Sequence, residues 1–425
     1  MVYSATDKRK KLLVIGNGMA ACRLLEEVLS LTPDLYQITV LSAERHAGYN
    51  RVLLSPVLSG ESDVEAITTH PFAWYKARNI DLRVGEAVEK VDRFHRTVTT
   101  LSGDCFSYDR LVFATGATPR RLTVPGAEAN NILTFRDLQD TRQLIDTTGR
   151  YRKAIVIGGG FLGIEAAEGL RARGMNVTLI HSAGSLLNRQ LDEEAGHYLQ
   201  RDLESRGLCF LMKGRTASFD VHENGDVRAV VLEDGRRIGA DIVVLAIGIE
   251  PNVALARSCG IEVGQAIRVD DTLQTFDPAI YAIGECVEHR QRTFGLIAPL
   301  YEQAKVCAAH LAEAGHRMYR FTDTPTRLKV SGISVYSAGE FEDTFGGSVL
   351  VLRDPAGGAY RRLVLRSSKL VGIVLYGNTD DAAFYEQLLL AETDVSAVRD
   401  QLLFGQDCAT PTSSVTSADA FGSAA

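Results

Sequence analysis

Residues 11–21 read KLLVIGNGMAA and decide the fold, because an apolar run suited to a buried strand passes through a glycine turn into a helical pattern. The turn has the form GxGxxA. In such a turn Gly16 allows the sharp bend, Gly18 lets a pyrophosphate approach the backbone, and Ala21 lets the helix pack closely on the strand. The helix N-terminus attracts phosphate. Glu44 follows the strand expected at 37–41 and is placed to accept a hydrogen bond from a ribose hydroxyl. A glycine turn without a ligand is the alternative.

A second turn of this kind, GGGFLG at residues 158–163, lies between a strand expected at 154–157 and a helix expected at 163–173. Two such turns predict two dinucleotides, and adjacent dinucleotides suit hydride transfer. His181 ends the next strand, expected at 176–180, where an acidic residue would bind the 2′-hydroxyl of NAD. No basic residue directly follows His181, and the first is Arg189. The sequence therefore predicts a preference for NADH over NADPH.

Short β-branched runs alternate with helical patterns through most of the chain, which is typical of α/β architecture. A strand at 110–115 ends in ATGATP, and a strand at 241–247 runs into GIEP in a similar way. A strand at 280–283 leads to Gly284 and Glu285, which close the first nucleotide domain. After residue 321 the pattern changes, with strands expected at 327–330, 334–337, 349–353, 360–366 and 370–376 and a helix at about 380–390. This last region reads as α+β.

We therefore expect an α/β protein with two Rossmann-like dinucleotide-binding domains, the second inserted in the first, and a C-terminal α+β domain. The first dinucleotide-binding domain should cover residues 1–118 and 266–320, and the second, with its connecting segment, should cover residues 119–265. The C-terminal interface domain should cover residues 321–405. Residues 406–425 lack apolar periodicity and are expected to be a disordered tail.

Composition excludes several classes of protein. The chain has 425 residues, 46 basic and 53 acidic, so its formal net charge is −7 and a nucleic-acid partner is not expected. No apolar stretch approaches the roughly 20 residues of a membrane span, so we expect no membrane association. There are seven cysteines but no CxxC motif, which argues against a disulfide framework and against a cysteine-rich metal site. These features predict a cytoplasmic protein.

Four motifs in order, GNGMAA, ATGATP, GGGFLGIE and IYAIGEC, give residues 10–320 a resemblance to the pyridine nucleotide–disulfide oxidoreductase superfamily of flavoprotein reductases. A narrower resemblance rests on YNRVLLS at 49–55, RQLD at 189–192, GECVEHR at 284–290, GLIAPLYEQA at 295–304 and two C-terminal segments, TRLKVSG and LVGIVLYGN. These segments are similar to the flavin module of NAD(P)H-dependent assimilatory nitrite reductases. They are also similar to stand-alone electron-transfer subunits of assimilatory nitrate reductases.

The resemblance implies an FAD-dependent NAD(P)H oxidoreductase that passes electrons from NADH through FAD to an external redox partner. The expected partner is a nitrate or nitrite reductase catalytic protein or a small electron carrier. Two alternatives stay open: a rubredoxin or ferredoxin reductase, and a flavin-containing redox-sensing interaction protein.

The resemblance also implies the cofactor-binding residues. A helix starting near Pro299 would point its positive end at the flavin, and Glu285 would reach the ribityl chain. The expected FAD residues are Gly16, Gly18, Ala21, Glu44, Asn50, Arg51, Val88, Ala114, Thr115, Gly116, Gly284, Glu285 and Pro299. The expected NAD(P)H residues are Gly158, Gly160, Gly163, Glu165, His181 and Gly248.

Several departures from the family matter. The nitrite reductases continue into iron–sulfur and sirohaem domains, which have no counterpart in this sequence, so we expect no chemistry on nitrogen oxides here. Residues 49–60 contain no cysteine, unlike the disulfide reductases, and Pro56 stands where many relatives have a lysine that pairs with the counterpart of Glu165. No catalytic residue is therefore assigned, and Glu165 is a candidate nicotinamide contact.

Two CxxH pairs, Cys22 and a basic cluster could each serve either the packing of the fold or a function. Two CxxH pairs, at 286–289 and 307–310, imitate the spacing of a zinc site, but packed cysteines are favoured, and no metal is expected. Cys22 is also expected to be a packed residue. The basic cluster of Arg361, Arg362, Arg366 and Lys369 reads as a solvated strand face, with docking of an acidic redox partner as the alternative.

Overall fold

The structure is a computed structural model that describes residues 9–409, except for 316, 322–324, 331, 343–345 and 355–356, and for 326–330 it describes the backbone alone. The chain forms two compact units. One contains the described residues up to Ala183 and those from Glu204 to Phe321. The other contains Gly184–Leu203 and the described residues from Pro325 onward. No helix in the described ranges is long and apolar enough to cross a membrane.

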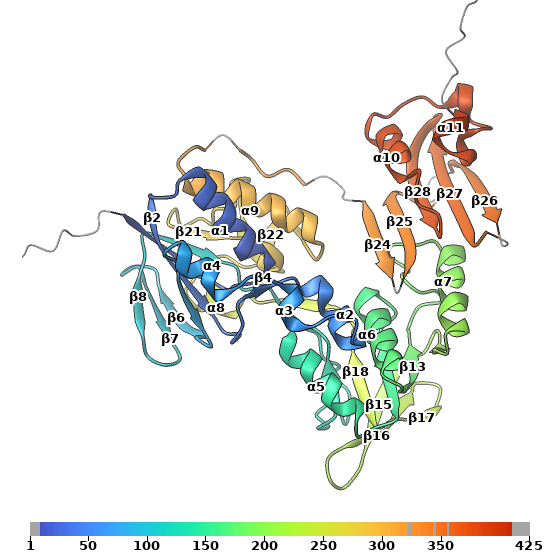
Figure 1. The fold of residues 1–425 in the computed structure, drawn as a ribbon, viewed down its shortest axis with the longest axis horizontal. Coiled ribbons are helices and arrows are strands. Elements are labelled where there is room, and N and C mark those ends of the chain that lie inside the picture. Colours follow the sequence, from blue (N-terminus) through green and yellow to red (C-terminus); the bar gives the residue numbers. More distant parts are fainter. Residues whose placement is uncertain are drawn as a thin grey trace, which may run out of the picture. The chain divides into compact units, whose positions relative to one another are not determined.

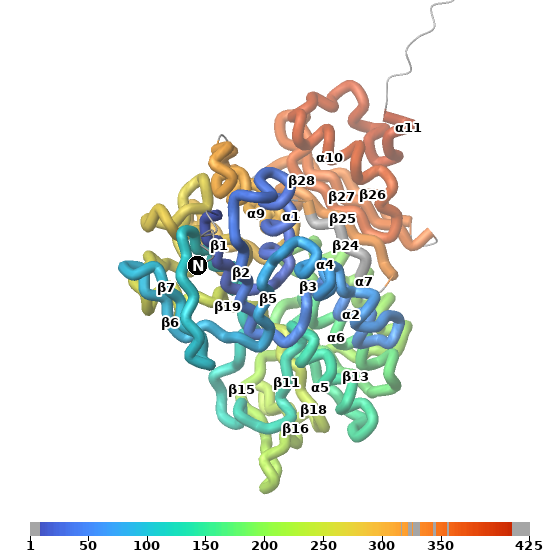
Figure 2. Tube along the Cα trace, turned by 60° about the vertical axis from the view of Figure 1, so that its left-hand side comes forward, coloured from blue at the N-terminus to red at the C-terminus, as the bar shows by residue number. Residues whose placement is uncertain are grey.

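The first unit begins with a five-stranded parallel sheet in the order β21-β9-β1-β2-β5. After two lysines at its start, its central strand is apolar, as expected for a parallel strand covered on both faces, and Leu12, Leu13 and Val14 are almost completely buried. Helices α1 and α9 lie side by side and share this core (Figures 1 and 2). The elements are β1 (Lys10–Ile15), α1 (Met19–Leu31), β2 (Tyr36–Ser42), β5 (Asp81–Val84), β9 (Arg110–Phe113), β21 (Ile280–Ala282) and α9 (Ile297–Leu311).

Between β2 and β9 the chain adds short elements. They are β3 (Gly48–Tyr49), a 3₁₀ turn (Arg51–Leu53), α2 (Leu54–Ser59), α3 (Val64–Ile67), β4 (Thr68–His70), α4 (Phe72–Ala77) and an antiparallel sheet of β6 (Val88–Asp92), β7 (Thr97–Thr100) and β8 (Cys105–Ser107). Of these, α2 packs on helices α5 (Leu138–Thr148) and α6 (Phe161–Ala172) of the second parallel sheet. Later elements are α8 (Ala254–Ser258), β20 (Ile267–Val269), a 3₁₀ turn (Gly284–Cys286), β22 (Val287–His289) and β23 (Arg292–Thr293).

A second parallel sheet of the same unit has the order β11-β18-β12-β13-β14. An antiparallel ribbon of two strands carries the chain into this domain and out of it, so that β21 can return to the first sheet. The second sheet consists of β11 (Ile132–Thr134), β12 (Lys153–Ile157), β13 (Asn176–Ile180), β14 (Cys209–Leu211) and β18 (Ile242–Leu245). Around it are α5 (Leu138–Thr148), α6 (Phe161–Ala172), β15 (Thr216–Val221), β16 (Val227–Leu232), β17 (Arg237–Gly239) and the ribbon strands β10 (Ala117–Pro119) and β19 (Ile249–Pro251).

The second unit is an antiparallel sheet in the order β24-β25-β28-β27-β26 with helices around it. Tyr336, Leu363, Ile373 and Tyr385 form the centre of its core. Its elements are β24 (Thr326–Val330), β25 (Ile333–Gly339), β26 (Ser348–Asp354), β27 (Ala359–Arg366), β28 (Lys369–Tyr376), α10 (Ala382–Leu390), 3₁₀ turns at Ser396–Val398 and Leu402–Phe404, and α11 (Gln406–Ala409). The α+β expectation for this region is confirmed.

One helix belongs with this sheet although the sequence placed it in the NAD(P)H domain. Helix α7 (Glu193–Ser205) packs the ring of Tyr198 5.6 Å from that of Tyr360 and 5.9 Å from that of Tyr376. Asp192, just before α7, accepts a 2.7 Å hydrogen bond from the hydroxyl of Tyr360. These aromatic contacts join distant parts of the sequence, so local patterns could not reveal them.

The sequence predicts a disordered tail from residue 406, and this boundary is too early. Residues Gln406–Ala409 form α11, and Ala409 is buried in the core of the second unit. Four residues without visible periodicity can fold when one small apolar side chain fills a place in a core. The other tail residues, 410–425, lie outside the described residues.

Candidate dinucleotide-binding sites

The turn between β1 and α1 uses its two glycines for different purposes. Gly16 has a φ of +109°, and a Cβ on it would collide with the carbonyl oxygen of Ala114, so the fold itself requires glycine there. Gly18 has an ordinary extended conformation, with φ −77° and ψ −176°, and no atom lies within 4 Å of the place where its Cβ would be. Since Gly18 is the N-cap of α1, this open space lies at the helix end that attracts phosphate.

The turn between β12 and α6 repeats this arrangement. Gly158 has a φ of +124°, and a Cβ there would collide with the carbonyl oxygen of Ala246. Gly160 is the N-cap of α6 at φ −86° and ψ −177°, and its Cβ position is also open. Gly163 lies so close to Gly158 that no larger residue fits. The two turns therefore present equivalent open spaces at two helix N-termini.

Buried polar atoms near the first turn test whether a large polar group fits there. The amide nitrogens of Asn17 and Gln303 and the Nε of Arg136 are buried without a hydrogen-bond partner in the described part of the chain. Gln303 is fully buried on α9, and its Oε1 accepts a 2.8 Å hydrogen bond from the backbone of Gly284. Because an unpaired buried donor costs free energy, these three donors fit a bound group with many acceptor oxygens. FAD is such a group.

Charged side chains connect the predicted FAD residues. Arg51 forms an ion pair with Glu44, whose Oε2 also accepts a 2.7 Å hydrogen bond from the hydroxyl of Tyr49. Burial raises the pKa of Tyr49, so this hydroxyl stays protonated. Arg51 also donates to the carbonyl of Arg136, 3.3 Å away, and the guanidinium of Arg136 forms an ion pair with Glu285.

Arg136 is, with Asn17 and Gln303, one of the three donors that sequence reasoning missed. It stands directly before the N-cap of α5, and its partner Glu285 is 149 positions away along the chain. No local motif marks it. Only the return of β21 to the first sheet brings the two residues together.

Other predicted FAD residues have structural contacts of their own. The side chain of Asn50 caps the turn after it by accepting a 3.1 Å hydrogen bond from the backbone of Val52. Thr115 donates a 3.0 Å hydrogen bond to the carbonyl of Asn252. Helix α9 begins at Ile297, so Pro299 lies within its first turn instead of starting it. The remaining members are Ala21 in α1, Val88 at the start of β6, Ala114 and Gly116 after β9, and Gly284 before β22. Their roles as FAD ligands stay predictions.

Glu165 has a serine as its partner where many relatives would supply a lysine. The hydroxyl of Ser55, in α2, donates a 2.5 Å hydrogen bond to Oε2 of Glu165, in α6. Burial raises the pKa of Glu165, and the hydrogen bond from Ser55 lowers it by less. No cation pairs with Glu165 among the described residues. The carboxyl group is thus held in place and keeps its proton to a higher pH than an ordinary glutamate.

His181 directly contacts the second glycine turn. Its Nδ1 accepts a 3.0 Å hydrogen bond from the backbone N–H of Gly159, which fixes the imidazole at the end of β13. Gly248, the last of the predicted NAD(P)H residues, has a φ of +109° and receives a 3.0 Å backbone hydrogen bond from Arg120. It therefore belongs to the ribbon that joins the two domains.

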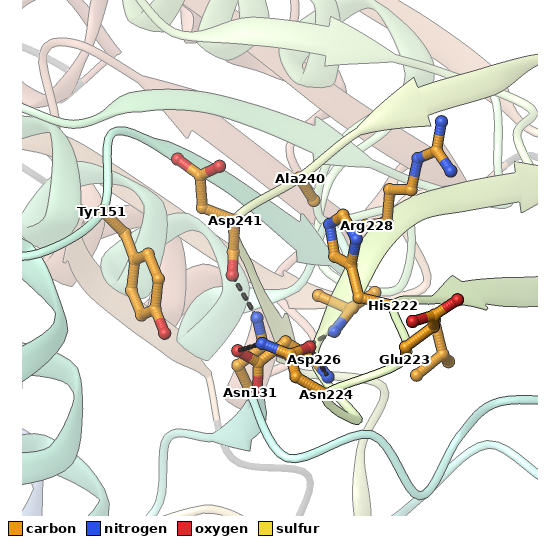
Figure 3. Close-up of a pocket in the computed structure, with 11 residues that line it drawn as sticks. Asn131, Tyr151, His222, Glu223, Asn224, Asp226, Arg228, Ala240 and Asp241 are labelled. Carbon is orange, nitrogen blue, oxygen red and sulfur yellow. Dashed lines mark hydrogen bonds between the residues drawn. The ribbon is translucent and has the colours of Figure 1, made fainter.

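A surface pocket on the second sheet is a separate feature (Figure 3). It is lined by Asn131, Tyr151, His222, Arg228 and Asp241, among others. Asp241 stands directly before β18, and its carboxylate accepts 2.8 Å hydrogen bonds from the backbone where β12 begins. The pocket therefore lies at the amino ends of these strands, whereas dinucleotides bind at the carboxyl ends.

The three cysteines that the sequence singled out, Cys22, Cys286 and Cys307, are packed. Cys22 is buried, and burial raises its pKa to about 11, while Cys286 and Cys307 are fully buried with raised pKa values. The histidines of the two CxxH pairs bond elsewhere: His289 to Asp271 at 2.8 Å and His310 to the hydroxyl of Tyr281 at 3.3 Å. Within the described ranges no three His, Cys, Asp or Glu side chains are grouped to hold a metal.

The basic cluster of the C-terminal domain is a solvated face only in part, because the side chains of Arg366 and Lys369 stay 38% and 45% exposed. Docking of a redox partner at this cluster stays a prediction. Arg361 is mostly buried and forms a 2.8 Å ion pair with Asp381. Arg362 donates to the carbonyl of Phe341 at 3.1 Å. Arg366 and Lys369 pair with Glu340 and Glu392. Arg361 and Arg362 are neighbours on β27 and point to opposite faces, so the four cations do not form a single patch.

Comparison with known proteins identifies the family. The family model for pyridine nucleotide-disulphide oxidoreductases matches residues 10–310, and the model for the C-terminal domain of rubredoxin NAD⁺ reductase matches residues 325–393. The chain belongs to the pyridine nucleotide-disulphide oxidoreductase family. The predicted resemblance and fold class are thereby confirmed, and so are the predicted cofactors FAD and NAD(P)H.

Individual known proteins are similar to this chain over nearly its whole length. A nitrite reductase [NAD(P)H] of Bacillus subtilis is 43% identical over 91% of this chain and 48% of its own length. The assimilatory nitrate reductase electron transfer subunit of the same organism is 38% identical over 93% of this chain and 51% of its own length. A crystal structure of a ferredoxin reductase from Rhodopseudomonas palustris is 26% identical, covers 91% of this chain and 96% of its own, and superposes with a TM-score of 0.82. The chain thus spans about half the length of the two curated relatives.

Proposed function

We propose that this chain is an FAD-dependent NAD(P)H oxidoreductase that passes electrons to an external redox protein. The observation that carries the proposal is the pair of equivalent glycine turns, in which Gly18 and Gly160 each leave open space at a helix N-terminus. One turn would hold FAD and the other NAD(P)H. FAD supplies the redox chemistry, because it accepts a hydride and releases its electrons singly or in pairs.

The residues of this chain would bind the two dinucleotides and orient them relative to each other. The unpaired N–H groups of α1, α6 and α9 supply fixed positive ends that suit phosphates and a negatively charged ring edge. Asn17, Gln303 and Arg136 supply buried donors, and Arg136 holds Glu285 in place. Glu165, bonded to Ser55, offers a carboxyl group of raised pKa for the carboxamide of the nicotinamide.

We further propose that the electron acceptor is an assimilatory nitrate or nitrite reductase protein. The names of the two Bacillus subtilis relatives support this acceptor. A small iron–sulfur carrier is a second candidate, because residues 325–393 match the C-terminal domain of rubredoxin NAD⁺ reductase. The cytoplasm is the proposed compartment, since all seven cysteines are free, as expected where thiols stay reduced.

The test uses the purified 425-residue protein. It should be yellow with one FAD per chain, and NADH should drive steady reduction of ferricyanide but no consumption of nitrate or nitrite. A native pull-down should recover a protein that carries a further redox centre. Absence of flavin would contradict the proposed function. Very slow turnover with bound FAD would favour a redox sensor, and nitrite consumption by the metal-free protein would contradict the need for a partner.

A further inference from the structure

The turn that follows β14 lies against the end of β13. The backbone N–H of His181 bonds the carbonyl of Leu211 at 2.9 Å, and that of Lys213 bonds the carbonyl of Ala183 at 3.0 Å. The N–H of Gly214 in turn bonds the carbonyl of His181 at 2.9 Å. Residues 212–214 therefore run beside residues 181–183. In dinucleotide-binding domains this strand end is where the 2′ position of the adenosine ribose is recognised.

The backbone of this turn is strained at a lysine. Lys213 has a φ of +56°, a left-handed conformation that glycine or asparagine adopts at lower cost. Its side chain is exposed, and its ammonium group has no ion pair or hydrogen bond among the described residues. The neighbouring Gly214 packs so closely that a Cβ would lie 2.9 Å from a methyl group of Ile180, the last residue of β13. The turn is thus fixed in place, and the flexible four-carbon stem of Lys213 starts beside residues 181–183.

The other groups at this strand end leave room for negative charge. His181 offers an imidazole where an acidic residue would repel a phosphate, and its Nδ1 already accepts the N–H of Gly159. Arg215, two residues after Lys213, is exposed, and no ion pair of its side chain is found in the described part of the chain. The adjoining segment carries Glu233, whose backbone N–H bonds the carbonyl of Arg215 at 2.9 Å, and Asp234, whose charge is balanced by its ion pair with Arg236. Two cations and one carboxylate leave this region with a positive balance.

From this placement we infer that the 2′-phosphate of NADPH binds between His181 and Lys213, so that the site takes NADPH as well as NADH. The inference rests on the proposed function and extends it to the class of nucleotide. It also revises the sequence-based preference for NADH. That prediction considered only the residues that directly follow His181. In the fold, the positive charge comes instead from Lys213, in the turn after the neighbouring strand β14.

The test measures binding of two redox-inactive probes, ADP-ribose and 2′-phospho-ADP-ribose, to the FAD-loaded full-length protein by calorimetry. The wild type should bind the phosphorylated probe about tenfold more tightly, because a charge-assisted contact to phosphate is added. Lys213→Asn should bring the two affinities close together. Asparagine tolerates the left-handed conformation, so this variant removes the charge without endangering the fold. Lys213→Arg should keep most of the preference.

Lys153→Gln is the matched control. It removes one exposed positive charge from the start of β12, at the amino ends of the strands, whereas Lys213 lies near the carboxyl end of β13. It should leave the affinity ratio unchanged, whereas salt should reduce the ratio in the wild type. Equal affinities in the wild type, or a ratio that Lys213→Asn leaves unchanged, would overturn the inference. Bleaching of the bound flavin by NADH is measured alongside. If NADH bleaches the flavin while the ratio is one, the inference alone has failed, and if NADH causes no bleaching, the proposed function has failed.

Discussion

Gly18→Val should separate folding from flavin binding. In the free protein the added side chain meets nothing within 4 Å, and φ −77° and ψ −176° are extended values that valine readily adopts. Valine is a poorer N-cap than glycine, so we expect the apoprotein to lose no more than about 1 kcal/mol of unfolding free energy. In the holoprotein the same side chain would occupy the path of the pyrophosphate. If two charge-assisted hydrogen bonds of about 1.5–3 kcal/mol each are lost, FAD affinity falls by roughly 10²–10⁴-fold.

Gly16→Val is the contrasting variant. There the side chain would collide with the carbonyl of Ala114, and φ is +109°, so the chain itself should be destabilised by at least about 2–3 kcal/mol. Urea unfolding is measured on the apoproteins, because bound FAD would add its own stabilisation, and FAD content is measured from absorbance after denaturation. Full FAD occupancy in Gly18→Val would refute the assignment of this turn. A Gly18→Val apoprotein as unstable as Gly16→Val would refute the argument from open space.

Three further outcomes are expected. Because Cys22 and Cys286 are buried with raised pKa values and are not thiolates, Cys22→Ala with Cys286→Ala should retain NADH–ferricyanide activity; loss of activity with FAD still bound would restore a thiol mechanism. The folded-state pKa of Glu165 lies above its ordinary value of 4.5, so the protonated form is favoured by folding and wild-type stability should fall as pH rises from that value through the raised pKa. Glu165→Gln should lack this decline in urea unfolding, and parallel pH profiles would contradict the raised pKa. Arg361→Met should destabilise the second unit by about 3 kcal/mol, because Asp381 loses its largely buried partner; unchanged unfolding would show that the ion pair contributes little.

The sequence predicts the nucleotide-binding core well, because its signals are local. The apolar strand, the glycine turn and the helical spacing that follow one another from Lys11 to Leu31 specify one strand–turn–helix unit, and the structure has it. Contacts between distant residues could not be predicted in this way. Arg136 meets Glu285 only after the chain has made a second domain and returned, and Lys213 approaches His181 only through the pairing of β13 with β14.

The basic cluster shows a different limit, because there the sequence suggested a surface and the fold provides partners. Arg361 and its neighbours suggested a surface because charged residues are usually exposed. In the fold, Arg361 instead joins β27 to the segments around α10, with Tyr385 and the carbonyl of Leu403 as further acceptors at 3.1 and 3.2 Å. Sequence composition gives the charge of a side chain but not the partner that the charge finds.

The packing of α7 on the C-terminal sheet limits how the protein can be cut or recombined. A fragment that starts at residue 321 would lack Tyr198 and Asp192, and would expose the ring of Tyr360 and leave its hydroxyl without its acceptor. A fragment of residues 119–265 would carry α7 without the sheet that buries it. Any chimera that exchanges the C-terminal domain must therefore transplant residues 184–203 as well, so the exchangeable cassette is discontinuous.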